Sequence, residues 1–278
     1  MSPPEIRPGQ SVELLKALHL LTRDGKLNQD SRRKLKQVYH LYHFIEPLLQ
    51  DAYAASANAA DATAPVLVDH GAGKSYLGFI LYDLFLKTRP RGQVIGVESR
   101  AELVHSSRQL AARLDFPRMQ FFAHSVEEAI ASPAIPPRVD IVTALHACDT
   151  ATDDAIRFAL ARDAQSIVLV PCCQAEVASA LRARKAEALA TTPLAELWRH
   201  PLHTREFASH LTNVLRCLLL QAHGYQLTVT ELVGWEHSMK NELIIARKTD
   251  AHRGDARARA ESILTALQLD SLRPRFLS

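Results

Sequence analysis

The feature of this sequence that most constrains its fold is a regular alternation of short β-like runs and helical segments. The β-like runs occupy residues 65–69, 93–98, 119–123, 139–145 and 166–170. Apolar residues recur at helical spacing in the intervening segments 77–86, 101–114 and 152–161. Strands that alternate with helices indicate βαβ units, so we expect an α/β protein with a mostly parallel sheet.

The last part of the chain departs from this alternation. A predicted helix over 207–222 is followed by two β-like runs at 227–232 and 243–246, with only a short loop between them. Two neighbouring strands without a helix between them predict an antiparallel hairpin that closes the sheet. Segment 191–204 does not fit the alternation, and we interpret it as an insertion.

Residues 1–62 have the pattern of a helical extension. Asn28 to Ser31 offers N-cap residues, and the positions after it repeat at helical spacing. Pro47 is expected to bend or end this helix. The apolar positions of that repeat are Leu35, Val38, Leu41, Tyr42 and Ile45. We therefore expect an extension over 1–62, a main domain over 63–250 and a C-terminal helix and tail over 251–278.

Composition allows a large core and sets few limits on partners. A chain of 278 residues can bury about 75% of its unfolded surface. The net charge of +3 permits a nucleic-acid partner without requiring one. The four cysteines follow no disulfide spacing, so we expect a reducing, cytoplasmic location. No apolar run reaches the roughly 18 to 20 residues of a membrane span, and no signal peptide is expected.

A glycine-rich turn follows the first predicted strand and begins a helix. Glycines allow a sharp turn and let a ligand approach the main chain closely. The helix behind the turn begins with free N–H groups and a partial positive charge. The sequence therefore predicts a cofactor-binding turn, with contacts from Asp69, His70, Gly71, Ala72, Gly73 and Lys74.

Two interpretations of this turn compete, besides a purely structural glycine turn. Gly73-Lys74-Ser75 matches the end of a phosphate-binding P-loop, but that motif requires glycine where this chain has Val68. Asp69 would also repel phosphate there. The D-x-G-x-G loop of class I methyltransferases fits better, and S-adenosylmethionine offers such a turn a carboxylate and a ribose. We favour this second interpretation.

Two further positions are candidates for contact with a nucleoside. Glu98 ends the second predicted strand, 25 positions after Gly73, where an acid accepts hydrogen bonds from ribose hydroxyls in Rossmann-like sites. The alternative is a solvated acid at a strand end. Ser125, with His124, follows the third strand, where adenine would lie, although both also suit an ordinary loop.

Two loops at the ends of the fourth and fifth strands carry polar and sulfur-containing side chains. His146 and Asp149 follow the fourth strand, at the crevice where open α/β sheets bind ligands. We predict both as site residues, with Asp149 also the N-cap of the next helix. For the cysteines we favour tight packing of small residues, with a zinc site or a covalent nucleophile as alternatives. These cysteines are Cys148, Cys172 and Cys173.

Taken together, these motifs resemble a known family. It is the methyltransferase-domain family that includes proteins with a glutathione-S-transferase C-terminal domain, RNA-adenine-dimethylase-like proteins of eukaryotes and relatives of the CHHC-finger tRNA 2′-O-methyltransferases. The matching segments are 68–77, 145–153, 170–173 and 236–241. The chain shows neither the CHHC finger nor the transferase domain, and it has Gln174 where the family pattern has histidine.

The resemblance implies a fold, a cofactor and a reaction. The fold would be a Rossmann-like, seven-stranded, mostly parallel sheet with an antiparallel last strand, and residues 63–250 would bind S-adenosylmethionine. The reaction would be methyl transfer to RNA, with tRNA or rRNA as the substrate and no obligatory metal. Protein or small-molecule methyl transfer, or a catalytically silent binding module of the same fold, are the alternatives.

The loop between the last two strands adds further candidates, namely Glu236, His237 and Lys240. Such loops often overhang the active site in this fold. A nitrogen acceptor needs little beyond positioning, whereas a ribose hydroxyl needs a proton acceptor. His146, His237 or Lys240 could provide one, and a solvated ion pair is the alternative for Glu236 and Lys240.

Basic runs offer possible phosphate contacts. Arg32-Arg33-Lys34-Leu35-Lys36 is the densest, and a solvated helix face explains it equally well. The run from Arg182 to Lys185 has the same two explanations. Trp198 and Trp235 could stack on a base or pack in the core.

Overall fold

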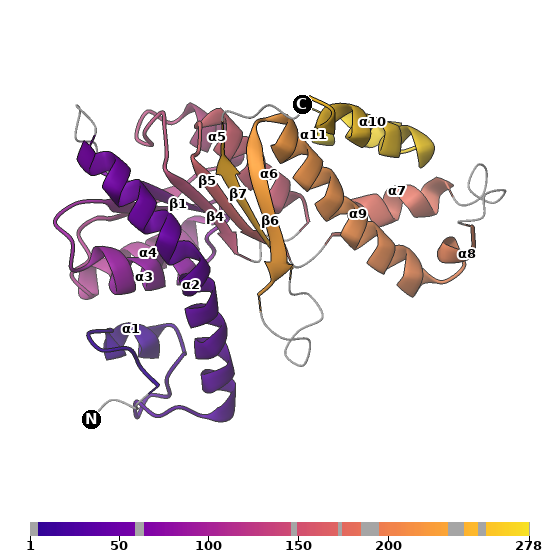
Figure 1. The fold of residues 1–278 in the computed structure, drawn as a ribbon. Coiled ribbons are helices and arrows are strands. Elements are labelled where there is room, and N and C mark those ends of the chain that lie inside the picture. Colours follow the sequence, from indigo (N-terminus) through magenta and orange to yellow (C-terminus); the bar gives the residue numbers. More distant parts are fainter. Residues whose placement is uncertain are drawn as a thin grey trace.

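The β-like runs of the sequence form one seven-stranded sheet with the strand order β3-β2-β1-β4-β5-β7-β6 (Figure 1). The computed structural model describes residues 5–58, 64–145, 149–171, 174–184, 195–232, 242–249 and 254–277. The strands are β1 (Val66–His70), β2 (Gln93–Glu98), β3 (Met119–Ala123), β4 (Ile141–Leu145), β5 (Ser166–Val170), β6 (Tyr225–Glu231) and β7 (Glu242–Lys248). The fold is therefore the expected Rossmann-like α/β sheet.

Six strands, β1 to β6, run in the same direction, and only β7, the last strand of the chain, is reversed. Val68 of β1 lies opposite Ile95 of β2 and Val142 of β4 in parallel register. In contrast, β7 inserts between β5 and β6 and is antiparallel to both. The predicted antiparallel closure is thus confirmed. The central strands are buried almost throughout, because both sheet faces are covered.

Helices cover both faces of the sheet. Leu67 faces a cluster formed with α2, α3 and α4, whereas Val68 faces a second cluster formed with α5, α6 and the end of α9. A third cluster joins α7 to α11 beyond β6 (Figure 1). The helices are α1 (Val12–Ala17), α2 (Gln29–Asn58), α3 (Tyr76–Leu81), a π-helical turn (Tyr82–Leu86), α4 (Ala101–Arg113), α5 (Val126–Ala131), α6 (Thr150–Ala161), α7 (Glu176–Arg184), α8 (Ala195–Trp198), α9 (Pro201–Ala222), α10 (Ala256–Ala266), a 3₁₀ turn (Asp270–Leu272) and α11 (Arg273–Phe276).

The long helix α2 begins where the sequence predicts and continues past its proline. The Asn28 side chain accepts a hydrogen bond from the Ser31 N–H at 2.8 Å and caps the helix. Pro47 does not end α2, and Figure 1 shows the helix changing direction partway along its length. An interior proline costs about 3 kcal/mol. Burial of Ile45 and Leu48, at about 1.5–3 kcal/mol each, offsets that cost.

The region after β5 differs most from the sequence prediction. The helix predicted over 207–222 begins six residues earlier, with Pro201 at its first turn, which favours a helix start. Residues 195–198 of the supposed insertion form α8. Trp198 is buried against Phe207, with ring centroids 5.0 Å apart, so it packs in the core and is not available to stack on a base.

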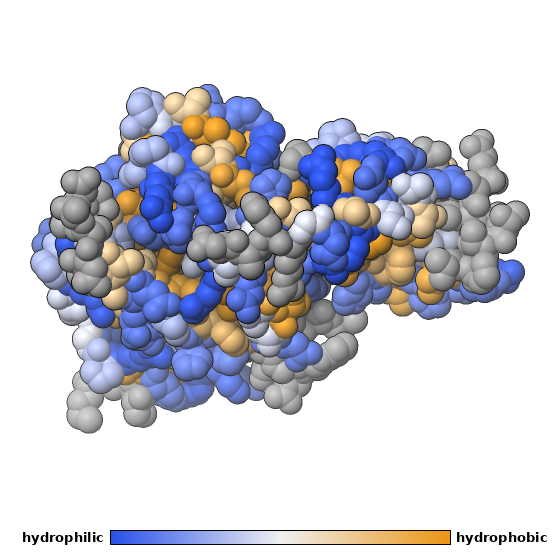
Figure 2. Space-filling view, turned by 45° about the horizontal axis from the view of Figure 1, so that its top comes forward, coloured by the Kyte–Doolittle hydropathy of each residue, from blue (hydrophilic) through white to orange (hydrophobic). Residues whose placement is uncertain are grey.

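The face of the molecule seen in Figure 2 is mostly hydrophilic, with hydrophobic side chains in patches between the polar ones. The large hydrophobic residues exposed among the described positions are Leu202, Val214 and Val229. Within those same positions, no helix combines the length and the apolar character needed to cross a bilayer.

Candidate functional site

The glycine-rich turn lies at the carboxyl end of β1, between β2 and β4. The strand order reverses at this point, and open α/β sheets bind their ligands in the crevice there. Gly71 and Gly73 have φ angles of 65° and 57°, which side chains disfavour. The Ala72 N–H donates to the Val97 carbonyl at 3.0 Å, which holds the turn against β2.

Asp69 lies beneath this turn and is almost completely buried. Its carboxylate accepts hydrogen bonds from the Thr143 hydroxyl at 2.9 Å and from the Ser75 hydroxyl at 3.4 Å. Burial raises the pKa of Asp69 to about 7, although the hydrogen bonds from Thr143, Gly78 and Ser75 act in the opposite direction. The predicted first acid of the loop is therefore a group that changes charge near neutral pH.

Glu98 lies beside the turn, as its spacing from Gly73 predicts. Its carboxylate accepts the Gly73 N–H at 2.8 Å and the Arg100 Nε–H at 2.9 Å. Partial burial raises the pKa of Glu98, but the hydrogen bonds from Arg100 and Gly73 outweigh it, and the pKa falls to about 2. Glu98 is thus an ionised acceptor whose partner Arg100 has an exposed side chain.

The main chain at Gly73 borders open space. A Cβ atom added at Gly73 would come no closer to another residue than 4.0 Å, at Arg100 Nη2. Among the described residues, only the Arg100 side chain comes that near, so a ligand can approach this backbone at Gly73. The neighbouring Lys74 side chain is exposed to solvent.

His70 contributes its main chain to the turn while its ring lies in the core. The ring centroid is 5.2 Å from that of Phe158, on the sheet face opposite Asp69. Burial lowers the pKa of His70 to about 4, so the ring is neutral at pH 7. Neither ring nitrogen has a hydrogen-bond partner within the described residues.

A cavity of about 410 Å³ opens beside Asp69 and Ala72. This volume lies within the range of about 300–1,000 Å³ that small-molecule sites occupy. Lys34, Gln37, Val38 and Leu41 of α2 form one wall, together with Leu18. The other lining residues are Asp69, Ala72, Tyr76, Leu77, Leu145 and Leu232. Sequence reasoning missed the α2 wall, because no local motif reports which helix face lies over a distant loop.

Ser125 caps the helix that follows it, whereas the Asp149 side chain does not. The Ser125 hydroxyl accepts the Glu128 N–H at 3.2 Å in a capping box at the start of α5, a helix that was not predicted. Asp149 stands at the N-cap position of α6 but does not cap it with its side chain. Its carboxylate instead accepts the Ala175 N–H at 2.9 Å, just before α7.

Asp149 also joins a buried network around Arg216. The Arg216 guanidinium donates to both carboxylate oxygens of Asp153, at 2.7 and 2.8 Å, and to the Asp149 carbonyl at 2.8 Å. It also donates to Asn213, whose amide donates to Glu242 at 2.8 Å. The network thus connects the loops that follow β4 and β5 with the start of β7.

Several predicted site residues lie outside the described residues, and their roles stay predictions. They are His146, Glu236, His237 and Lys240, together with Cys148, Cys172 and Cys173. Among the positions that the structure does describe, no group of three His, Cys, Asp or Glu side chains is arranged to hold a metal ion.

Comparison with known proteins gives one family match. Residues 33–180, more than half of the chain, match the model of a family described as a methyltransferase domain. The match includes the glycine turn, Glu98 and the α2 wall of the cavity, and it supports S-adenosylmethionine as the cofactor. A search of curated protein sequences finds no match.

Solved structures of several methyltransferases are similar in chain fold. A methyltransferase of Podospora anserina bound to S-adenosylhomocysteine has a TM-score of 0.45 and 11% identity, over 88% of this chain and 89% of its own. Precorrin-6y C5,15-methyltransferase of Geobacter metallireducens has a TM-score of 0.40 and 16% identity, over 72% of this chain and 87% of its own. Fibrillarin of Aeropyrum pernix with bound S-adenosylmethionine has a TM-score of 0.40 and 14% identity, over 66% of this chain and 66% of its own.

Proposed function

Because the chain belongs to the methyltransferase-domain family, we propose that it is an S-adenosylmethionine-dependent methyltransferase that modifies RNA. One observation carries the proposal. The glycine turn presents open main chain at Gly73, with the ionised Glu98 on one side and the cavity over Asp69 on the other. A ligand with a nucleoside at one end and an amino acid at the other suits this arrangement.

The residues around the turn fit each part of S-adenosylmethionine. Glu98 would accept hydrogen bonds from the ribose hydroxyls once Arg100 has moved aside. Asp69, on the cavity side of the turn, would lie toward the cationic amino-acid end. Gly73 leaves room for the ligand between these two carboxylates. When bound, S-adenosylmethionine supplies a methyl group attached to a sulfonium, which is electrophilic.

The cavity would hold the acceptor group. Its walls are largely apolar, with leucines from α2, α3, β4 and the end of β6, so they would exclude water from the reacting atoms. Positioning two reactants in this way corresponds to effective molarities on the order of 10⁵ to 10⁸ M. A nitrogen acceptor needs little more. For a hydroxyl acceptor, we assign removal of the proton to His146, His237 or Lys240, with Asp149 and Glu236 orienting the surrounding loops.

RNA is the acceptor class that the charges favour. The basic run Arg32 to Lys36 lies in the first turns of α2, and α2 forms one wall of the cavity. Phosphate groups account for most of the affinity of proteins for nucleic acids. We extend the proposal to tRNA or rRNA as the substrate, to a cytoplasmic location and to a closer relationship with the CHHC-finger tRNA 2′-O-methyltransferases.

Transfer of a labelled methyl group tests the proposed reaction. The purified chain would be incubated with methyl-labelled S-adenosylmethionine and, separately, with total RNA, lysate protein and a small-molecule extract. We expect ribonuclease-sensitive label in the RNA and no label with Gly73→Trp. Label in protein or in small molecules alone would contradict the RNA assignment. No label in any fraction, despite binding of S-adenosylhomocysteine, would indicate a silent binding module.

A further inference from the structure

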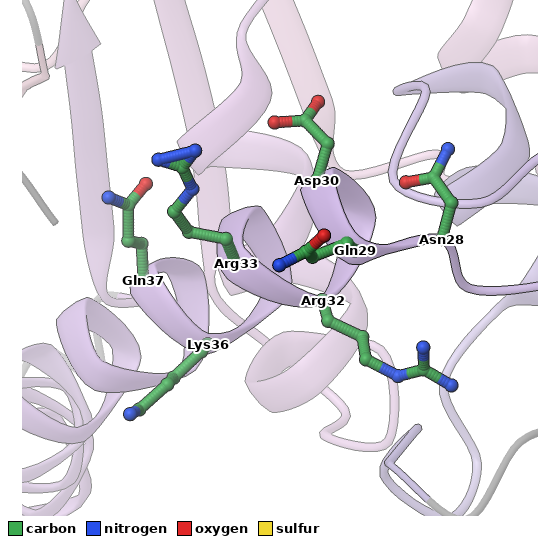
Figure 3. A pocket seen from close by; sticks show the side chains of 7 residues that line it. All are labelled: Asn28, Gln29, Asp30, Arg32, Arg33, Lys36 and Gln37. Atoms are coloured by element: carbon green, nitrogen blue, oxygen red, sulfur yellow. The ribbon is translucent and has the colours of Figure 1, made fainter.

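An exposed polar stripe runs along the first turns of α2. Gln29, Arg33, Lys36 and His40 are spaced by four, three and four residues, which places them on one side of a helix. All four side chains are exposed. A shallow concavity of about 750 Å³ follows this side of α2, and Figure 3 shows Arg33 and Lys36 extending from the helix there.

Two of the four basic side chains in this run have no acidic partner. Arg32 pairs with Glu5 at 3.0 Å, and Lys34 pairs with Asp30 at 2.8 Å. Arg33 and Lys36 make no ion pair with any residue that the structure describes. The stripe therefore presents two adjacent positive charges that are free to bind anions.

The shallow concavity beside the stripe and the cavity beside Asp69 share one lining residue, Gln37. Its side chain lines both the shallow concavity and the cavity beside Asp69. Figure 3 shows Gln37 and Arg33 on the same side of α2. A polymer held at Arg33 and Lys36 would consequently have its neighbouring groups at the mouth of the cavity.

The chemistry changes between the stripe and the cavity. Outside, the unpaired groups are the cations of Arg33 and Lys36. Inside, the lining is mostly aliphatic, with the ring of Tyr76, the carboxyl group of Asp69 and one cation, Lys34, which is already paired with Asp30. A mostly apolar cavity with a buried acid, whose one cation is already paired, favours a flat, uncharged ring over a phosphate. The matching ligand has an anionic backbone and uncharged aromatic side groups, which describes a single nucleic-acid strand.

We propose that Arg33 and Lys36, with Gln29 and His40, bind the phosphates of a single RNA strand and direct one extruded base past Gln37 into the cavity. This inference rests on the proposed function and adds to it where the RNA lies and how the acceptor reaches the methyl donor. Enzymes that modify a base commonly extrude it into such a cavity.

The salt dependence of RNA binding tests the phosphate contacts. The probe is a fluorescein-labelled, mixed-sequence, single-stranded RNA of 16 nucleotides. Each phosphate contact contributes about 0.7 to the slope of log affinity against log salt for single strands. We therefore expect Arg33→Gln/Lys36→Gln to lower the slope by about 1.4 and the affinity on the order of tenfold or more. Arg257→Gln/Arg259→Gln removes the same charge from the distant helix α10 and should leave the slope unchanged.

Gln37→Trp tests whether a base enters the cavity. RNA with 2-aminopurine in place of adenine should fluoresce more strongly when the wild type binds it, because an extruded base loses its stacking. The bulky side chain at the mouth should abolish this increase and change RNA affinity less than twofold. An undiminished increase would overturn base insertion, and a thermal melt of the variant would confirm that it folds.

Binding of S-adenosylhomocysteine separates failure of this inference from failure of the proposed function. The two double variants, Arg33→Gln/Lys36→Gln and Arg257→Gln/Arg259→Gln, should bind it like the wild type. A wild type that binds S-adenosylhomocysteine but not RNA at low salt would overturn the inference alone, and so would an unchanged slope in Arg33→Gln/Lys36→Gln. If polyglutamate displaced the labelled RNA as effectively as unlabelled RNA does, the partner would instead be an acidic protein. A wild type that binds neither ligand would overturn both.

Discussion

At the scale of single residues, Asp69 has the largest electrostatic consequence. A buried carboxylate costs free energy unless its environment compensates, and here two hydroxyl groups do so only in part. The pKa of Asp69 is therefore raised from 3.8 to about 7 in the folded chain. The folded state holds the proton more tightly than the unfolded chain, so the stabilisation is complete below pH 4 and is lost as the pH rises through 7.

Comparison with Asp69→Asn measures this effect, because asparagine has the same shape and does not titrate. Each pH unit between the two pKa values corresponds to about 1.4 kcal/mol. We expect the wild type to lose about 3 kcal/mol of unfolding free energy relative to Asp69→Asn between pH 5 and pH 8. Urea unfolding at both pH values provides the comparison. An identical difference at the two pH values would show that Asp69 titrates normally.

At the scale of elements, Arg216 holds α9 to α6 and to the loop after β4. Its side chain is fully buried, and the Asp153 side chain is only 9% exposed. Removal of one member of a buried ion pair typically costs about 3–5 kcal/mol, because the other charge is left without a partner. The network therefore stabilises loops around the candidate site as well as the fold.

We expect Arg216→Met to destabilise the chain by about 3–5 kcal/mol in urea unfolding. Adding Asp153→Leu should recover part of the loss, because it removes the unpaired carboxylate. A loss below 1 kcal/mol for the single variant, or a double variant no more stable than the single one, would contradict this account of the network.

The elements also show how far sequence reasoning reaches. Strands β2, β3 and β5 have the predicted bounds. In β2 and β5, Val and Ile residues between turn signals are typical of buried parallel strands, whereas β3 alternates buried and more exposed side chains. Helix α5 was missed because six residues are too few to repeat the 3.6-residue helical period, although Ser125 and Glu128 carry the signature of a capping box.

The candidate site was predictable only where its residues are close in sequence or at strand ends. The glycine turn and Glu98 follow from spacing along the βαβ unit. The α2 wall of the cavity was not predictable, because tertiary packing brings Lys34, Val38 and Leu41 to Asp69 across more than 25 residues. Likewise, the Asp149 carboxylate accepts the N–H groups of Ala175 and Glu176 at the start of α7, and not those of the helix that follows it in sequence.

At the scale of the whole molecule, the N-terminal extension and the sheet share one hydrophobic cluster. Leu14, Leu41 and Ile45 pack with Leu67 and Val94 of the sheet. Removing the extension would expose that sheet face to water, at about 25 cal/mol for each Å² of apolar surface. The α7 to α11 cluster, in contrast, packs mainly beyond β6.

We therefore expect a chain that begins at residue 63 to lose its fold and its binding of S-adenosylhomocysteine. Circular dichroism and size-exclusion chromatography would report the first loss, and calorimetric titration the second. A chain that lacks residues 251–278 is the control. It should be less stable than the full chain but should still bind S-adenosylhomocysteine. A folded, ligand-binding chain without the extension would refute the shared core.

The most direct measurement of the central claim is calorimetric titration of S-adenosylhomocysteine into the wild type, Gly73→Trp and Gly9→Trp. Gly73 and Gly9 both have positive φ angles, and both border open space, so the two substitutions carry similar strain. The account predicts saturable binding by the wild type and by Gly9→Trp, and none by Gly73→Trp, whose side chain would fill the ligand space above the turn. Equal binding by all three proteins would place the ligand elsewhere and contradict the account.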